Sequence, residues 1–223
     1  MRIFRWLLDK MEAQRRAQEE ARASFVESLR DPVAKQVDWT PLKGGGTNFR
    51  THNLLWAEGR EARYRTSWGS KLFLGIFFVV GLGEVAGAAA LGFAGEYAAA
   101  GMMTFMGLVF AGVAYGLSRG TVSPRVFDLQ RRMYRTTEET PPLWPEAPEG
   151  REGWVPFDEI HAIQVLPETV RSKNGSFTSW ELNLVLRDGK RLAVIDHGDG
   201  ATVRADAERL GREIGVPVWT WPG

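Results

Sequence analysis

Residues 72–118 read LFLGIFFVVGLGEVAGAAALGFAGEYAAAGMMTFMGLVFAGVAYGLS and contain only two charged side chains, Glu84 and Glu96. A helix needs about 20 apolar residues to cross the hydrocarbon core of a bilayer, which is about 30 Å thick. The stretch is long enough for two such crossings joined by a tight turn. It therefore predicts a transmembrane helical hairpin over 72–118, with polar regions of the chain before and after it.

Positive charges flank this apolar stretch on both sides, whereas the turn expected near residues 92–97 carries none. The flanking cations include Arg60, Arg63, Arg65 and Lys71 before the hairpin, and Arg125, Arg131 and Arg132 after it. Short loops rich in lysine and arginine stay in the cytoplasm. The pattern predicts a multi-pass protein with two crossings and both termini in the cytoplasm. Frequent arginine, alanine and glycine are typical of a GC-rich bacterial genome, so we expect a bacterial inner membrane.

The region before the hairpin begins with an expected amphipathic helix over residues 1–31. Phe4, Leu7, Leu8 and Met11 recur at i, i+3, i+4 and i+7, and Asp31-Pro32 ends the pattern. Residues 32–47 contain three consecutive glycines near their end, and we expect them to form a linker. The helix begins MRIFRWLLDK, which fits both a position in the membrane interface and docking onto a protein. The sequence leaves both alternatives open.

Strand patterns surround the hairpin. Residues 48–71 hold two of them, 48–57 and 61–67, and residues 119–223 hold five more, at 121–129, 131–136, 154–166, 177–187 and 190–196. In the stretch 177–187, Trp180, Leu182 and Leu184 alternate with other residues, which is the period of a half-buried strand. An amphipathic helix over 202–214 follows and stops at Gly215.

This order predicts an α+β membrane protein in which the hairpin is inserted between strands 2 and 3 of a seven-stranded β-barrel with a C-terminal helix. The segments VPFDEIHAIQVLPE (155–168), SWELNLVLRDGKRLAV (179–194) and ADAERLGREIGVPVW (205–219) carry a resemblance. They resemble bacterial two-helix membrane proteins with a pleckstrin-homology-like cytoplasmic domain and, more distantly, the photosystem I assembly-factor family. The resemblance covers about residues 48–220. It implies a fold and a membrane address, and it transfers no catalytic residues.

Glu84 lies near the middle of the first expected crossing. An ionised carboxylate is costly there, and such residues are functional candidates. We expect Glu84 to lie level with Met106 and within reach of Thr104. A proton or ion relay and a protonated side chain that hydrogen-bonds across the hairpin or to a partner both fit the position.

Two small-residue motifs, Gly83-x-x-x-Gly87 and Gly112-x-x-x-Gly116, let helix backbones approach closely. Packing inside the hairpin explains them, and so does association with another membrane protein or with a second copy of the chain. Glu84 and the four glycines are therefore candidates for contact with an intramembrane partner.

The flanking cations named above, together with Arg135, are the best binding candidates. They border the membrane on the expected cytoplasmic side, where each charge near anionic lipid contributes about 1 kcal/mol. The sidedness of the hairpin alone already requires several of them. We expect membrane lipid as a partner and Arg60, Arg63, Arg65, Lys71, Arg125, Arg131 and Arg132 as candidate headgroup contacts.

The remaining composition narrows the chemistry. The chain has 223 residues, no cysteine and a net charge of +1, which excludes thiolate chemistry and gives no global attraction to nucleic acid. Asp196, His197 and Asp199 cluster in IDHGDG, but their spacing matches no established metal-ligand pattern. We expect no metal, no cofactor and no enzymatic activity.

Three functions remain. The first is a non-enzymatic inner-membrane protein whose pleckstrin-homology-like module acts as an interaction or assembly platform for a membrane complex. The alternative is a membrane-resident immunity or regulatory protein that acts through its transmembrane hairpin. A small transporter or an enzyme is the third and weakest fit, because two crossings form a pathway only in an oligomer and no nucleophile–base pair is evident.

Overall fold

The computed structural model describes residues 2–57, 59–137, 153–172 and 175–221. It is a mixed α+β structure that separates into two compact units, Met1–Gly46 with Asp158–Gly223, and Thr47–Phe157. Residues 48–71 and 119–223, which we expected to form one β domain, are divided between these units.

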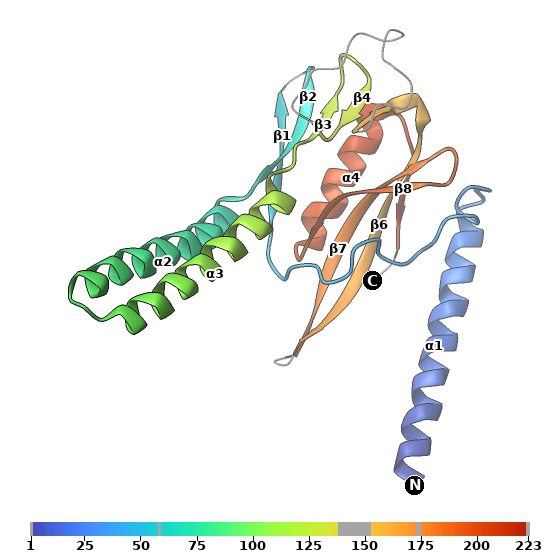
Figure 1. Cartoon of the computed structure of the whole chain (residues 1–223). Helices are drawn as coiled ribbons and strands as arrows, with labels where there is room; N and C mark the ends of the chain where they lie inside the picture. Colours follow the sequence, from blue (N-terminus) through green and yellow to red (C-terminus); the bar gives the residue numbers. More distant parts are fainter. Residues whose placement is uncertain (1, 58, 138–152, 173–174, 222–223) are drawn as a thin grey trace. The chain divides into compact units, whose positions relative to one another are not determined.

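The unit Thr47–Phe157 contains a five-stranded antiparallel sheet and the apolar helical hairpin. The sheet has the order β1-β2-β3-β4-β5, so each strand pairs with its neighbour in the chain. The elements are β1 (His52–Ala57), β2 (Glu61–Thr66), α2 (Trp68–Phe93), α3 (Tyr97–Val122), β3 (Arg125–Asp128), β4 (Met133–Arg135) and β5 (Trp154–Pro156). The hairpin follows the first two strands, as the sequence predicts, and forms the connection from β2 to β3 (Figure 1).

Alternation along β2 explains how this sheet acquires a buried face. Ala62 and Tyr64 are buried, whereas the side chains between them are partly exposed. Ala62 lies opposite Phe127 on β3, and Phe127 lies opposite Tyr134 on β4. The rings of Phe127 and Tyr134 are 4.9 Å apart, so apolar and aromatic contacts run across three strands.

The second unit contains a four-stranded sheet with the order β8-β7-β6-β9, in which β9 runs parallel to β6. Its elements are α1 (Arg2–Ser28), β6 (Ile160–Ser172), β7 (Gly175–Leu186), β8 (Arg191–His197), α4 (Gly200–Ile214) and β9 (Val218–Thr220). One stripe of α4 is buried, formed by Val203, Ala207, Leu210 and Ile214. Asp199 caps this helix by accepting a hydrogen bond from the amide of Thr202 (3.1 Å), and Gly215 ends it at a φ of 79°.

The closed seven-stranded barrel expected from the sequence is wrong. The described residues form nine strands in two open sheets. One reason is a 3₁₀ turn, Phe157–Glu159, which interrupts the expected strand 154–166 and leaves β5 in one sheet and β6 in the other. The other reason is β9, which occupies one edge of β6 over Ile163–Val165, so that edge offers no hydrogen bonds for closing a barrel.

Candidate functional site

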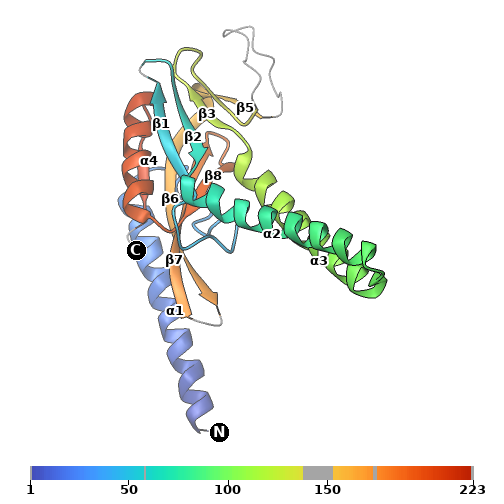
Figure 2. The same cartoon turned by 90° about the vertical axis from the view of Figure 1, so that its left-hand side faces the viewer.

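The helices α2 and α3 form an antiparallel hairpin and lie side by side in both views (Figures 1 and 2). The segments long and apolar enough to cross a membrane are Trp68–Phe93, with 26 residues, and Tyr97–Ser118, with 22. At about 1.5 Å per residue, each exceeds the roughly 30 Å of a hydrocarbon core. Only 11% of each apolar window is buried inside the structure, whereas a core helix of a soluble protein is mostly buried. These features are consistent with a two-pass membrane protein.

The backbones of the two helices approach each other closely at Gly81 and Gly107. A Cβ atom on Gly81 would lie 3.0 Å from the carbonyl oxygen of Gly107, and one on Gly107 would lie 2.9 Å from the carbonyl oxygen of Gly81. Ala88 and Ala114 are also buried. Small side chains therefore bring the two backbones into contact, as is common between transmembrane helices. We call this line of contact the seam.

Of the four glycines in the motifs predicted from sequence, one lies at the seam. A Cβ atom on Gly87 would lie 2.7 Å from Cε of Met103 on the facing helix. Gly83, Gly112 and Gly116 have no atom within 4 Å of the position where a Cβ would stand. These three glycines therefore do not contribute to packing inside the hairpin.

Glu84 lies beside the seam and is half-buried. Its Cβ atom is 3.1 Å from the position that a Cβ atom on Gly107 would occupy, so Glu84 lies level with Gly107, one residue beyond the expected Met106. The hydroxyl of Thr104 donates a hydrogen bond to the carbonyl oxygen of Ala100 within its own helix (2.9 Å). Glu84 is therefore half-buried at the level of Gly107, and Thr104 is hydrogen-bonded within its own helix.

The seven candidate headgroup residues do not form one patch. Arg65, Lys71 and Arg125 lie where the sheet joins the hairpin, whereas Arg60 lies at the opposite end of β2. The six residues of β2 span about 20 Å at 3.3 Å per residue. The carbonyl oxygen of Arg60 accepts a hydrogen bond from the amide of Leu129 (2.8 Å), which places Arg60 beside the β3–β4 turn that carries Arg131 and Arg132.

Most of these cations already have protein partners. Arg63 forms an ion pair with Glu61 (3.3 Å), and Arg131 forms one with Asp128 (3.4 Å). The guanidinium of Arg132 lies 5.8 Å from the centre of the Phe157 ring.

At the hairpin end of the sheet, Nη1 of Arg125 lies 3.2 Å from Nε2 of His52, and burial lowers the pKa of Arg125. Burial also raises the pKa of the nearby Tyr134 to about 12. Arg65 and Lys71 are exposed at this end, where a headgroup can reach them.

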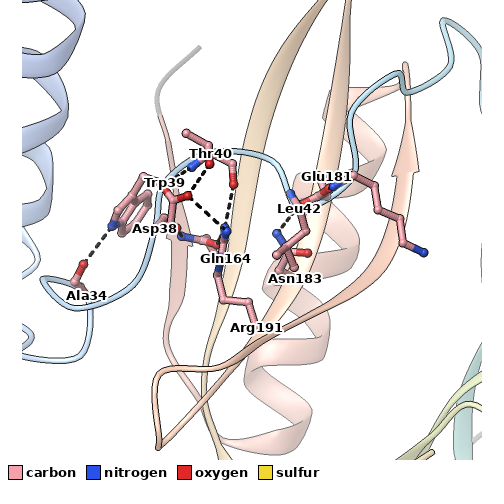
Figure 3. Close-up of polar contacts among 10 residues, drawn as sticks. Ala34, Asp38, Trp39, Thr40, Leu42, Gln164, Glu181, Asn183 and Arg191 are labelled. Atoms are coloured by element: carbon pink, nitrogen blue, oxygen red, sulfur yellow. Dashed lines mark hydrogen bonds and ion pairs between the residues drawn. The ribbon is translucent and has the colours of Figure 1, made fainter.

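A second site of interest lies in the other unit, where residues 38–46 run across the sheet. We call this segment the strap. The carboxylate of Glu181 is 1% exposed and accepts hydrogen bonds from the amides of Leu42 (2.8 Å) and Lys43 (2.9 Å). The side-chain amide of Asn183 donates a third hydrogen bond to it (2.6 Å). Figure 3 shows Glu181 at the strap and Asn183, two residues further along β7, beside Glu181.

Side chains of the neighbouring strands hold the rest of the strap. Nη1 of Arg191 donates to the carbonyl oxygen of Thr40 (2.8 Å) and to Oε1 of Gln164 (3.0 Å), and Nε2 of Gln164 donates to the carbonyl oxygen of Asp38 (3.2 Å) (Figure 3). Glu168 accepts hydrogen bonds from two of the three consecutive glycines, at 3.0 and 3.4 Å. The segment expected to be a linker is therefore fixed along most of its length.

Asp196 lies under the end of the strap. The hydroxyl of Ser179 donates a hydrogen bond to Asp196, and a Cβ atom on Gly46 would overlap both side chains. Burial raises the pKa of Asp196 to about 6, and the charges of Glu181 and Glu168 add to this effect. Three carboxyl groups, those of Asp196, Glu181 and Glu168, therefore gather beneath the strap.

Sequence reasoning missed the strap contacts, although a signal was present. The β7 sequence alternates, which puts Ser179, Glu181 and Asn183 on the face opposite to its leucines. We expected the polar residues on this face to meet water. Their almost complete burial shows that backbone groups of the strap take the place of water.

The three residues of IDHGDG point to different partners. Asp196 faces the strap, Asp199 caps α4, and Nδ1 of His197 accepts a hydrogen bond from the amide of Asp199 (3.2 Å). Within the described ranges, no three His, Cys, Asp or Glu side chains are placed to hold a metal ion together.

The C-terminal end of α1 packs against the core of its unit, whereas its N-terminal part is exposed. The Phe25 ring lies 5.2 Å from the Trp39 ring and 5.1 Å from the Trp221 ring, both nearly edge-on. Just beyond the helix, Oδ2 of Asp31 lies 2.8 Å from Nε2 of His161. Every described side chain between residues 4 and 21 is exposed. Membrane binding and protein docking both remain open for this part of α1.

Comparison of the chain with protein-family models, with curated proteins and with solved structures gave no match. The resemblance to membrane proteins with a pleckstrin-homology-like domain therefore stays a prediction.

Proposed function

We propose that this chain is a two-pass protein of a bacterial inner membrane and that its cytoplasmic β units serve as a platform on which a membrane complex assembles. The observation that carries the proposal is the exposed apolar hairpin inserted directly between β2 and β3. A connection of this kind holds a folded sheet at the membrane surface. The cations Arg65, Lys71 and Arg125 beside the hairpin, and the lack of any in the turn Ala94–Glu96, favour cytoplasmic termini.

A binding role fits the polar groups in the second unit better than catalysis does. Glu181, Gln164 and Arg191 are largely buried, and each bonds to the backbone of the strap. Side chains committed in this way stabilise a surface and are not available to a substrate. The resemblance to pleckstrin-homology-like membrane proteins and to the photosystem I assembly factors supports the same role, here with two open sheets.

The proposal is tested by purification from membranes in mild detergent. The full tagged chain is compared with a variant in which residues 72–118 are replaced by an unrelated two-helix membrane hairpin. A platform that works through its β units keeps its co-purifying partner after the exchange. Reporter fusions at the C-terminus and in the turn after Phe93 map the sidedness, and a C-terminus outside the cytoplasm contradicts the proposal.

The second candidate is an immunity or regulatory protein that acts through the hairpin. It is favoured by one specific observation, which is that Gly83, Gly112 and Gly116 face open space and leave room for a partner helix. In that case the exchanged hairpin loses the partner, and Glu84→Ala or Gly112→Leu abolishes the biological effect without lowering the amount of protein in the membrane.

A further inference from the structure

The outer face of α2 carries an open apolar groove of about 430 Å³. Its lining residues are Val80 and six residues that follow one another at helical spacing, namely Trp68, Lys71, Leu72, Gly75, Ile76 and Val79. Positions i, i+3, i+4, i+7, i+8 and i+11 share one side of a helix. No atom lies within 4 Å of the place where Gly75 would carry a Cβ, so the missing side chain creates the hollow.

The groove lies on the side of α2 away from α3. The seam contains Gly81, and the ring of Phe77 faces Phe110 on α3 at 6.0 Å. Leu72 and Val79 are each separated from these residues by about half a turn of helix. They are 67% and 68% exposed, so the facing helix leaves the groove uncovered.

The two ends of the groove differ in chemistry. Trp68 and Lys71 stand at the start of α2, next to the polar sheet, and both are exposed. The remaining lining residues are aliphatic or glycine, and none of the described residues that line the groove carries a carboxylate. Tryptophan and lysine at the start of a transmembrane helix lie at headgroup level, with the apolar residues beyond them at the depth of the acyl chains.

We infer that this groove binds one phospholipid with an anionic headgroup. The phosphate lies at the Lys71 ammonium, and one acyl chain follows Leu72, Gly75 and Val79 into the membrane. The inference rests on the proposed position of the hairpin in a bilayer. A lipid fits better than a partner helix because one end of the groove is positively charged and the rest is apolar. This arrangement matches a lipid that has an anionic headgroup and an apolar acyl chain. Lys71 accounts for the preference for an anionic headgroup, and the hollow at Gly75 accounts for where the acyl chain lies.

The experiment is native mass spectrometry of the full chain released from detergent after equilibration with equal amounts of phosphatidylglycerol and phosphatidylcholine that carry the same acyl chains. We expect one retained phosphatidylglycerol per chain and an excess over phosphatidylcholine of about fivefold, because one cation near a headgroup contributes about that factor. Lys71→Gln removes the excess. Gly75→Leu fills the hollow and lowers retention of both lipids.

Two matched variants complete the design. Lys190→Gln removes a lysine from the β7–β8 turn, and Gly112→Leu adds the same side chain to an open position on α3. Both keep the lipid bound as in the unchanged chain. Equal retention of the two lipids by the unchanged chain, or no loss with Gly75→Leu, overturns the inference and indicates bulk annular lipid. A dimer that Gly75→Leu dissociates also overturns it, because a second copy then occupies the groove. Extraction of the unchanged chain from membranes by alkaline carbonate is a different failure, which removes the proposed function itself.

Discussion

Replacement of Glu181 by alanine tests whether one buried carboxylate holds the strap. Glu181 receives two backbone hydrogen bonds from the strap, at 2.8 and 2.9 Å. A hydrogen bond to a charged group contributes about 1.5–3 kcal/mol. Loss of both bonds lowers the free energy of opening the strap by at least about 3 kcal/mol, and since about 1.4 kcal/mol is a factor of ten, the open form becomes at least about a hundredfold more populated.

Trypsin reports this opening directly. The strap contains Lys43, whose side chain is exposed while its amide is bound to Glu181. Cleavage after Lys43 requires the backbone to leave the sheet, so its rate follows the population of the open strap. We expect the fragment 1–43 to appear about a hundredfold faster in Glu181→Ala than in the unchanged chain. Faster amide exchange at Leu42 and Lys43 provides a second measurement.

The matched control is Glu168→Ala, which removes the other carboxylate that binds the strap. Its bonds to Gly45 and Gly46 are 3.0 and 3.4 Å long and lie nearer to solvent, so we expect a less than tenfold effect. Glu181→Gln keeps the shape of the side chain and is expected to fall between the two. If Glu181→Ala is cleaved after Lys43 no faster than Glu168→Ala, with unchanged circular dichroism, the assignment of Glu181 as the main anchor is refuted.

Three further predictions concern the seam and two titrating groups. Gly107→Val forces a side chain against the backbone of α2 and lowers hairpin stability in mixed micelles by about 1–3 kcal/mol, whereas Gly112→Val leaves it unchanged. The pKa of Asp196 is about 6 in the folded state against 3.8 for a free carboxyl, so the folded state binds this proton more tightly than the unfolded state does. The stabilisation from the bound proton is present below pH 4 and is lost as the pH rises through 6. At 1.36 kcal/mol per pKa unit the loss is about 2–3 kcal/mol, reduced by the water that still reaches the carboxyl. Asp196→Asn is therefore more stable than the unchanged chain at pH 7 and equally stable at pH 4 in thermal unfolding. Burial raises the pKa of Asp31, but the hydrogen bonds from His161 and the backbone together outweigh burial, so the net pKa is lowered. Asp31→Asn therefore costs up to about 1 kcal/mol at pH 6, and this difference disappears as the pH falls below about 4.

Long periodic features of this chain were predictable from sequence. The apolar stretch 72–118 forms two helices joined by the turn Ala94–Glu96, close to the turn expected near residues 92–97. The amphipathic pattern of 202–214 likewise became α4, with its cap at Asp199 and its stop at Gly215. In both cases the interactions that decide the structure are between residues close in sequence, so the spacing of residues along the chain predicts them.

Features that depend on distant partners were not predictable. The strand pattern 154–166 continues without a visible break, yet a 3₁₀ turn at Phe157–Glu159 divides it between two sheets. Three residues, Val218–Thr220, are too few to show a period, and their pairing with β6 is parallel and distant in sequence.

The candidate sites divide in the same way. The glycine motifs were identified by their spacing, but spacing does not show which side of a helix meets a neighbour. Gly81 and Gly107 belong to neither predicted motif, yet the two backbones approach each other closely there, because the phase of each helix relative to the turn decides which residues face inward. Which cations near the hairpin remain exposed likewise depended on carboxylates at other positions of the sheet.

The three consecutive glycines show why a composition typical of a flexible linker is compatible with a fixed segment. Glu168 binds the backbone amides of Gly45 and Gly46, and a carboxylate reaches an amide most easily where no side chain stands in the way. Gly46 approaches Ser179 and Asp196 so closely that any side chain would collide with them, and Gly45 has a φ of 88°. The glycines therefore allow the backbone of the strap to lie close to the sheet, and the hydrogen bonds to the carboxylates hold it there. A polar strand face opposite a glycine-rich segment is thus a pattern from which such a strap is expected in other sequences.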